Sequence, residues 1–122
     1  MPYSRRRMVI YLSCAAGLPL LARAPFEDRA QTLRALVVDH RRARHLGQRY
    51  VAQVPVERDA VVLARLIDAA LMDDHAATVD DRAALADALD ARIRAEFGAG
   101  QIVRVDGWVL ARTEARLCAL CV

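Results

Sequence analysis

The stretch IVRVDGWVLA, residues 102–111, decides the fold prediction for the C-terminal part of the chain. Its apolar residues alternate on both sides of Asp106-Gly107, a pair that favours a two-residue type I′ turn. This turn sets Val105 opposite Trp108 and places four apolar side chains on one face, namely Val103, Val105, Trp108 and Leu110. The sequence therefore predicts one β-hairpin near 102–111 with a buried face.

Before the hairpin the apolar spacing is helical. Apolar residues recur at intervals of three and four in the segments 27–54 and 57–72, with Pro55 between them. A third helix is predicted to begin at Thr78, capped by its hydroxyl, and to stop at Gly98 and Gly100. Thr113 would cap a short last helix, RLCALC. The predicted fold class is mainly α, a small bundle of three to four helices with one C-terminal β-hairpin.

Composition and charge divide the chain at about residue 24. All 18 basic residues are arginine, and four of them lie in residues 1–24, which leaves 14 arginines against 15 acidic residues. The net charge of +3 for the whole chain thus becomes −1 for residues 25–122. We expect these residues to form a single small domain, and its near-neutral charge does not require a polyanionic partner.

Residues 1–24 have the three parts of an export signal. Ser4 to Arg7 is basic, Met8 to Leu21 is apolar, and Ala22-Arg23-Ala24 provides small residues at the exit. The apolar run is shorter than the roughly 20 residues that span a bilayer. An ordinary buried first helix remains an alternative, as does a lipoprotein signal around Cys14.

Ser4-Arg5-Arg6-Arg7-Met8-Val9 resembles the twin-arginine export motif, with Arg5 and Arg6 as its arginine pair. The resemblance covers the first 24 residues and implies a periplasmic or otherwise exported protein. Pro25 would follow a cleavage point after Ala24, and proline is a poor residue there. An uncleaved leader would tether the protein to the membrane.

The resemblance also carries the prediction of function. The twin-arginine route exports folded proteins, many of them cofactor-bearing oxidoreductases, and partners can travel with them. In its leader and size, this chain resembles the small subunits and escorts of periplasmic dehydrogenases. We expect an exported, non-catalytic accessory subunit with no cofactor of its own, bound to a co-exported oxidoreductase subunit.

Four residues are candidates for the partner surface. Tryptophan and arginine contribute most to binding energy at protein interfaces. The candidates are Trp108 and Arg104 on the hairpin, and Arg41 and Arg42 in the arginine-rich segment DHRRARH. Trp108 as an ordinary core residue is the alternative interpretation.

Cys118 and Cys121 form a C-A-L-C motif near the end of the chain. In an oxidising compartment such a pair could form a disulfide or act as a redox couple. A redox pair usually lies at a helix N-terminus, which lowers a thiol pKa, whereas this pair falls at a helix end. Apolar packing, a passive disulfide, redox activity and pairing with another chain all remain open.

The sequence contains no convincing metal site. His40 and His45 are five residues apart, whereas helical zinc ligands are usually four apart, and His40 is expected at the boundary of the core. Asp73-Asp74 and Asp80-Asp81 lack the spacing of a calcium loop and are assigned to helix ends. We predict no metal, and we find no catalytic constellation.

Two alternative functions belong to other classes. Three helices followed by a hairpin is also the order of a cytoplasmic winged-helix nucleic-acid-binding protein, but acidic residues on the third helix disfavour this interpretation. The other alternative is a small periplasmic thiol protein that uses Cys118 and Cys121.

Overall fold

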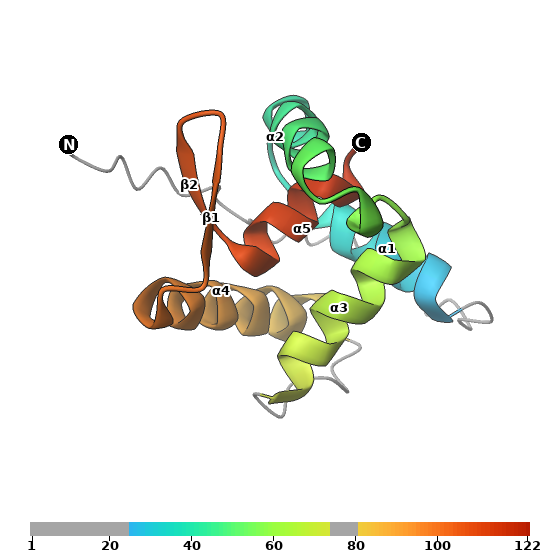
Figure 1. The fold of residues 1–122 in the computed structure, drawn as a ribbon. Coiled ribbons are helices and arrows are strands. Elements are labelled where there is room, and N and C mark those ends of the chain that lie inside the picture. Colours follow the sequence, from blue (N-terminus) through green and yellow to red (C-terminus); the bar gives the residue numbers. More distant parts are fainter. Residues whose placement is uncertain (1–24, 74–80) are drawn as a thin grey trace.

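The computed structural model describes residues 25–73 and 81–122 (Figure 1). It is mainly α-helical with a two-stranded hairpin near the C-terminus, as the sequence predicts. The predicted export leader with Arg5 and Arg6, and the predicted cap at Thr78, lie outside the described residues. Within the described ranges, no helix has both the length and the apolar character needed to cross a membrane.

The hairpin is formed by β1 (Ile102–Val105) and β2 (Trp108–Ala111), paired antiparallel with Val105 opposite Trp108. Asp106 and Gly107 have φ angles of 50° and 78°, and a type I′ turn requires positive φ at both central positions. Both the predicted register and the predicted turn are confirmed. Val105 and Leu110 on the apolar face are fully buried.

The predicted helix over 27–54 is wrong in one respect, because it is two helices. α1 (Pro25–Ala35) ends before two core residues, Leu36 and Val37, and α2 (His40–Gln53) begins after Asp39. Asp39 caps α2 by accepting a hydrogen bond from the Arg42 backbone N–H at 3.0 Å. Because α2 begins at His40, this residue is exposed at the helix end and is not at the core boundary as predicted.

The next two helices follow the predicted segments closely. A 3-10 turn, η1 (Pro55–Glu57), leads into α3 (Ala60–Asp73). α4 (Arg82–Ala99) is capped by Asp81, whose carboxylate accepts from the Ala83 N–H at 3.1 Å. Gly100 ends α4 in the left-handed conformation with φ of 73°, whereas Gly98 lies inside the helix.

The last helix, α5 (Arg112–Leu120), lies at the centre of the fold with the other helices around it (Figure 1). Seven of its nine residues are buried. α2 crosses α5 at Gly47, where an added Cβ would lie 2.2 Å from the Cys118 carbonyl oxygen, so the two backbones are in direct contact. At the end of α5, backbone carbonyls accept hydrogen bonds from two arginines: Arg34 Nε donates to Leu120 O at 2.5 Å and Arg44 Nε donates to Cys121 O at 3.3 Å.

The predicted cap at Thr113 is wrong, because α5 begins two residues earlier than that cap implies. Ala111 occupies the N-cap position, and its N–H donates to Glu114 Oε1 at 3.2 Å. Thr113 is fully buried and its hydroxyl donates to Glu96 Oε2 at 2.9 Å. The Thr113 side chain thus contacts α4 instead of capping α5.

Candidate functional site

The arginine-rich helix α2 lies beside the hairpin and contacts it through Arg42, His45 and Gln53. Successive residues of a helix turn by about 100°, and the buried stripe of α2 contains Ala43, Leu46, Gly47 and Tyr50. The other positions around the helix therefore face solvent, and basic side chains occupy most of them. We call this region the α2–hairpin surface, comprising Arg41, Arg42, His45 and Arg49 of α2 with Arg104, Asp106 and Trp108 of the hairpin.

Trp108 and Arg42 are brought together at the centre of this surface. The Arg42 guanidinium carbon lies 5.3 Å from the centroid of the Trp108 ring, which is within the range of a cation–π contact. The ring is half-buried and packs against the hydrophobic core. Arg42 Nε also lies 3.7 Å from Asp39 Oδ2. Trp108 thus contacts the core and also contributes to the surface.

Two further contacts hold the hairpin on α2. His45 Nε2 and Asp106 Oδ2 are 2.8 Å apart at the tip of the hairpin, and Gln53 Nε2 donates to the Arg104 carbonyl oxygen at 3.2 Å. The hydrogen bond from His45, together with the positive charge of Arg49, lowers the pKa of Asp106 below its ordinary value of 3.8. Asp106 is therefore a carboxylate at neutral pH.

The other predicted partner residues lie on different sides of this surface. Arg41 is exposed and is turned by about 100° from Arg42 around α2, toward solvent. Arg104 is exposed opposite Val109, on the hairpin face that Trp108 does not share. The structure therefore joins Arg42 and Trp108, whereas Arg41 and Arg104 extend the surface on either side.

Cys118 and Cys121 are buried and form no disulfide with each other. Burial is the main factor that raises the pKa of Cys118, and the nearby charge of Glu114 adds to it. Burial also raises the pKa of Cys121, while Arg34 and Arg44 oppose the shift. The Cys121 thiol donates to the Leu117 carbonyl oxygen at 3.6 Å. This environment keeps both groups as thiols rather than nucleophilic thiolates.

The part of the chain that the structure describes holds no group of three histidine, cysteine, aspartate or glutamate residues placed to bind a metal ion.

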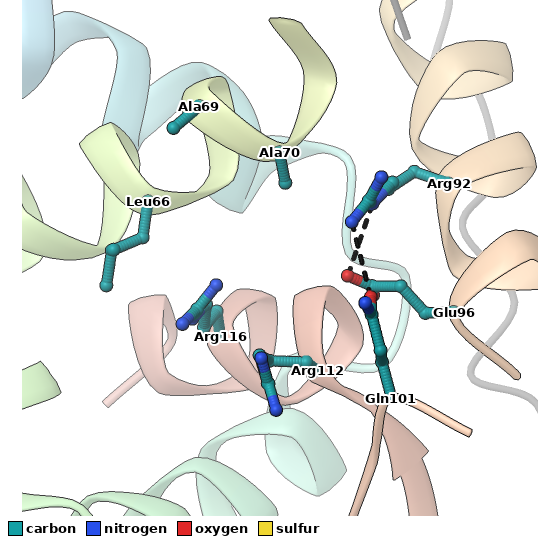
Figure 2. Close-up of a pocket in the computed structure, with 8 residues that line it drawn as sticks. All are labelled: Leu66, Ala69, Ala70, Arg92, Glu96, Gln101, Arg112 and Arg116. Atoms are coloured by element: carbon teal, nitrogen blue, oxygen red, sulfur yellow. Dashed lines mark hydrogen bonds and ion pairs between the residues drawn. The ribbon is translucent and has the colours of Figure 1, made fainter. Parts of the chain in front are cut away.

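A second feature, a pocket between α3, α4 and α5, was not predicted from the sequence (Figure 2). Its volume is about 300 Å³. One wall is apolar and comes from α3, and the other carries three guanidinium groups from α4 and α5. The apolar residues are Leu66, Ala69 and Ala70, and the basic residues are Arg92, Arg112 and Arg116.

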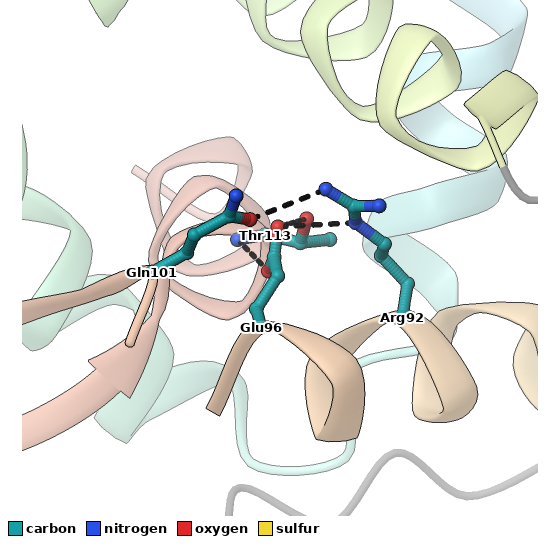
Figure 3. A network of polar contacts seen from close by, with 4 residues as sticks. All are labelled: Arg92, Glu96, Gln101 and Thr113. Atoms are coloured by element: carbon teal, nitrogen blue, oxygen red, sulfur yellow. Dashed lines mark hydrogen bonds and ion pairs between the residues drawn. The ribbon is translucent and has the colours of Figure 1, made fainter. Parts of the chain in front are cut away.

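The floor of the pocket is a buried polar network around Glu96 (Figure 3). Glu96 is only 2% exposed. Its Oε1 accepts from the Thr113 N–H at 2.8 Å, and its Oε2 accepts from Arg92 Nε at 3.3 Å as well as from the Thr113 hydroxyl. Arg92 also donates to Gln101 Oε1 at 3.3 Å, so the network joins α4, α5 and the segment before β1.

Only part of this pocket had a signal in the sequence. Arg112 and Arg116 are four residues apart, as are Arg92 and Glu96, and such pairs share a helix face. The approach of α4 to α5 then brings the two pairs together, which no local spacing indicates.

Comparisons of the chain with protein-family models, with curated proteins and with solved structures find no match.

Proposed function

We propose that this chain is a non-catalytic accessory subunit or escort that binds an acidic surface of a partner protein through its α2–hairpin surface. The observation that carries the proposal is the Trp108 ring, held against Arg42 amid exposed arginines. Buried aromatic rings and arginines dominate the energy of protein interfaces, and surrounding charges speed association. A tryptophan ring surrounded by basic side chains is therefore the arrangement expected of a docking surface.

The proposed partner is an exported protein, such as a co-exported oxidoreductase subunit. This part of the proposal rests on the twin-arginine resemblance of residues 1–24, with Arg5 and Arg6 as the signal. An accessory subunit contributes binding rather than chemistry, and this role agrees with the protonated state that burial favours for Cys118 and Cys121. The thiol-protein alternative is disfavoured for the same reason.

A nucleic acid is the second candidate partner, because the hairpin contacts the arginine-rich α2 as well as the acidic α4. Asp106 lies in this surface and Asp39 lies beside its Arg42, however, and their carboxylates would repel phosphates. Residues 25–122 as a whole also carry no excess of positive charge. These charges favour a protein partner over DNA or RNA.

Charge reversal tests the docking surface. The tagged full-length chain, expressed in the organism that encodes it, would be compared with the variants Arg41→Glu/Arg49→Glu and Arg58→Glu. All three altered arginines are exposed, but Arg58 follows η1 and lies outside the α2–hairpin surface. We expect the double variant to recover about tenfold less of the cross-linked partner than the wild type, which corresponds to a loss of about 1.4 kcal/mol of binding free energy. The control Arg58→Glu should recover as much as the wild type.

Equal recovery by all three proteins would remove the α2–hairpin surface from the proposal. Salt-dependent retention of the wild type on duplex DNA, lost in the double variant, would replace the protein partner by a nucleic acid.

Export is tested separately by Arg5→Lys/Arg6→Lys, with Arg23→Lys as a control in the same leader but outside the arginine pair. Cell fractionation and N-terminal sequencing should find the wild type and the control beyond the inner membrane, with the double variant retained in the cytoplasm. If all three remain in the cytoplasm and begin at Met1 or Pro2, the leader is not an export signal.

A further inference from the structure

The pocket between α3, α4 and α5 contains more positive than negative charge. Arg92 pairs with Glu96 at 3.3 Å, and Arg116 Nε pairs with Glu57 Oε1 at 2.6 Å. Both carboxylates are buried, at 2% and 6% exposed. Two of the three arginines in the pocket thus have an acidic partner, which leaves Arg112 as the third positive charge.

Arg112 differs from the other two arginines in its surroundings. Its guanidinium makes no hydrogen bond or ion pair with any residue in 25–73 or 81–122, although its backbone N–H donates to Gln101 O at 3.1 Å. Arg112 and Gln101 are both exposed, so the pocket opens to solvent beside them. A ligand could therefore reach the uncompensated charge directly.

The negative group on the pocket floor does not cancel this charge. Both oxygens of Glu96 already accept hydrogen bonds from Thr113, and Oε2 also accepts from Arg92 (Figure 3). A carboxylate that already accepts three hydrogen bonds and is shielded from solvent has little capacity left to bind Arg112. Counted over residues 25–73 and 81–122, the three arginines and their two carboxylate partners leave the pocket one negative charge short of neutrality.

The apolar wall opposite the arginines indicates what the uncharged part of the ligand is. Leu66, Ala69 and Ala70 of α3 face the guanidinium groups across the pocket (Figure 2). A volume of about 300 Å³ is at the lower end of the range for small-molecule sites, which combine apolar walls with a few charged groups. The chemistry that fits is one oxyanion attached to a short apolar body.

We propose that this pocket binds a small organic monocarboxylate. The carboxylate lies against Arg112 and Arg116, which are four residues apart and share one face of α5, and the aliphatic body lies on the α3 wall. This site shares no residue with the α2–hairpin surface, so it stands independently of the proposed docking function.

The test is an NMR titration of the ¹⁵N-labelled full-length chain with sodium hexanoate, following the Gln101 side-chain amide and the Arg112 Nε–H. Hexylammonium chloride has a similar aliphatic body but the opposite charge, and inorganic phosphate supplies the charge without the body. The variants are Arg112→Gln and, as a matched control, Arg58→Gln. Neither arginine makes a side-chain pair within the described ranges, so both variants should keep the fold.

We expect saturable hexanoate shifts in the wild type and in Arg58→Gln, and a Kd about fivefold to tenfold higher in Arg112→Gln, as expected for loss of a charge-assisted hydrogen bond. Equal Kd values for Arg112→Gln and the wild type would overturn the proposal. It would also be overturned by shifts that do not saturate, or by phosphate or hexylammonium reproducing the hexanoate shifts.

Discussion

The side chain of Glu96 is 2% exposed and accepts hydrogen bonds from the Thr113 backbone, the Thr113 hydroxyl and Arg92. Within a buried network of this kind, the backbone N–H and the hydroxyl of Thr113 depend on the carboxylate as their acceptor. Glu96 therefore stabilises the approach of α4 to the start of α5 and holds the floor of the pocket.

Replacing Glu96 by glutamine should lower the free energy of unfolding by about 3 kcal/mol, because the amide cannot accept from Thr113 and Arg92 with both of its terminal atoms. Urea denaturation followed by circular dichroism measures this change. Asp87→Asn is the control, an exposed acidic residue on the same helix, and should change stability by less than about 0.5 kcal/mol. Equal effects of the two substitutions would contradict the role given to Glu96.

Tyr50 is a second buried polar residue, and its hydroxyl donates to Glu57. Burial is the largest of the effects that raise the pKa of Tyr50 to about 12, and the hydrogen bond and negative charge of Glu57 add to it. The unfolded chain loses the tyrosine proton near pH 10, whereas the folded chain keeps it until about pH 12. The contribution of Tyr50 to the free energy of unfolding is thus complete below pH 10 and is lost as the pH rises toward 12.

We therefore expect the free energy of unfolding to fall between pH 10 and 12, with a shallower fall in Tyr50→Phe. The chain has no lysine, and burial also raises the pKa of Cys118 and Cys121, whose ionisation accounts for the part of the fall that remains. Urea denaturation at a series of pH values provides the measurement. Identical slopes for the two proteins would show that Tyr50 ionises normally.

Among the secondary-structure elements, the closest packing is between α2 and α5. Gly47 brings the α2 backbone against the carbonyl oxygen of Cys118, and α5 is in turn buried on most of its surface. Because α2 also carries one side of the docking surface, its position against α5 determines where Arg42 meets Trp108.

Gly47→Ala should destabilise the protein by about 3 kcal/mol, because its Cβ would lie 2.2 Å from a backbone oxygen that cannot move without shifting α5. Gly98→Ala is the matched control. Gly98 lies near the end of α4 with no heavy atom within 4 Å of an added Cβ, so the change should stabilise the helix by about 0.5 kcal/mol. Thermal unfolding distinguishes the two, and a tolerated Gly47→Ala would mean that the helices are farther apart.

At the scale of the whole molecule, the buried apolar residues among those that the structure describes form one cluster, to which the hairpin and each of the helices α1 to α5 contribute. Trp108 packs against this cluster from the hairpin, and it is the only tryptophan in the chain. The hairpin alone would be marginal in water, so its stability depends on the helices.

Unfolding should consequently be a single transition. Tryptophan fluorescence reports on the hairpin and far-ultraviolet circular dichroism on the helices, and we expect the same urea midpoint from both. A fluorescence midpoint clearly below the dichroism midpoint would show that the hairpin separates from α2 first. In that case the α2–hairpin surface would not be a stable unit.

The local sequence determined the hairpin turn, the end of α4 and the helical segments that follow from apolar spacing. The register of the hairpin follows from Asp106-Gly107, and the end of α4 follows from Gly100, because each depends on the φ angles of the residues concerned. The mainly α fold class and the α3 segment follow from apolar spacing alone. Residues 1–24 and their export motif belong to this local information too, and they remain a prediction.

Tertiary structure decided the features that depend on contacts between distant residues. The break between α1 and α2 arises because Leu36 and Val37 enter the core while Asp39 caps a new helix, and periodicity alone does not mark that break. Thr113 leaves its predicted cap because Glu96, 17 positions away, offers a buried acceptor. The arginine pocket exists because α3 and α4 both pack near α5, so its charge balance is a property of the packing and not of any segment.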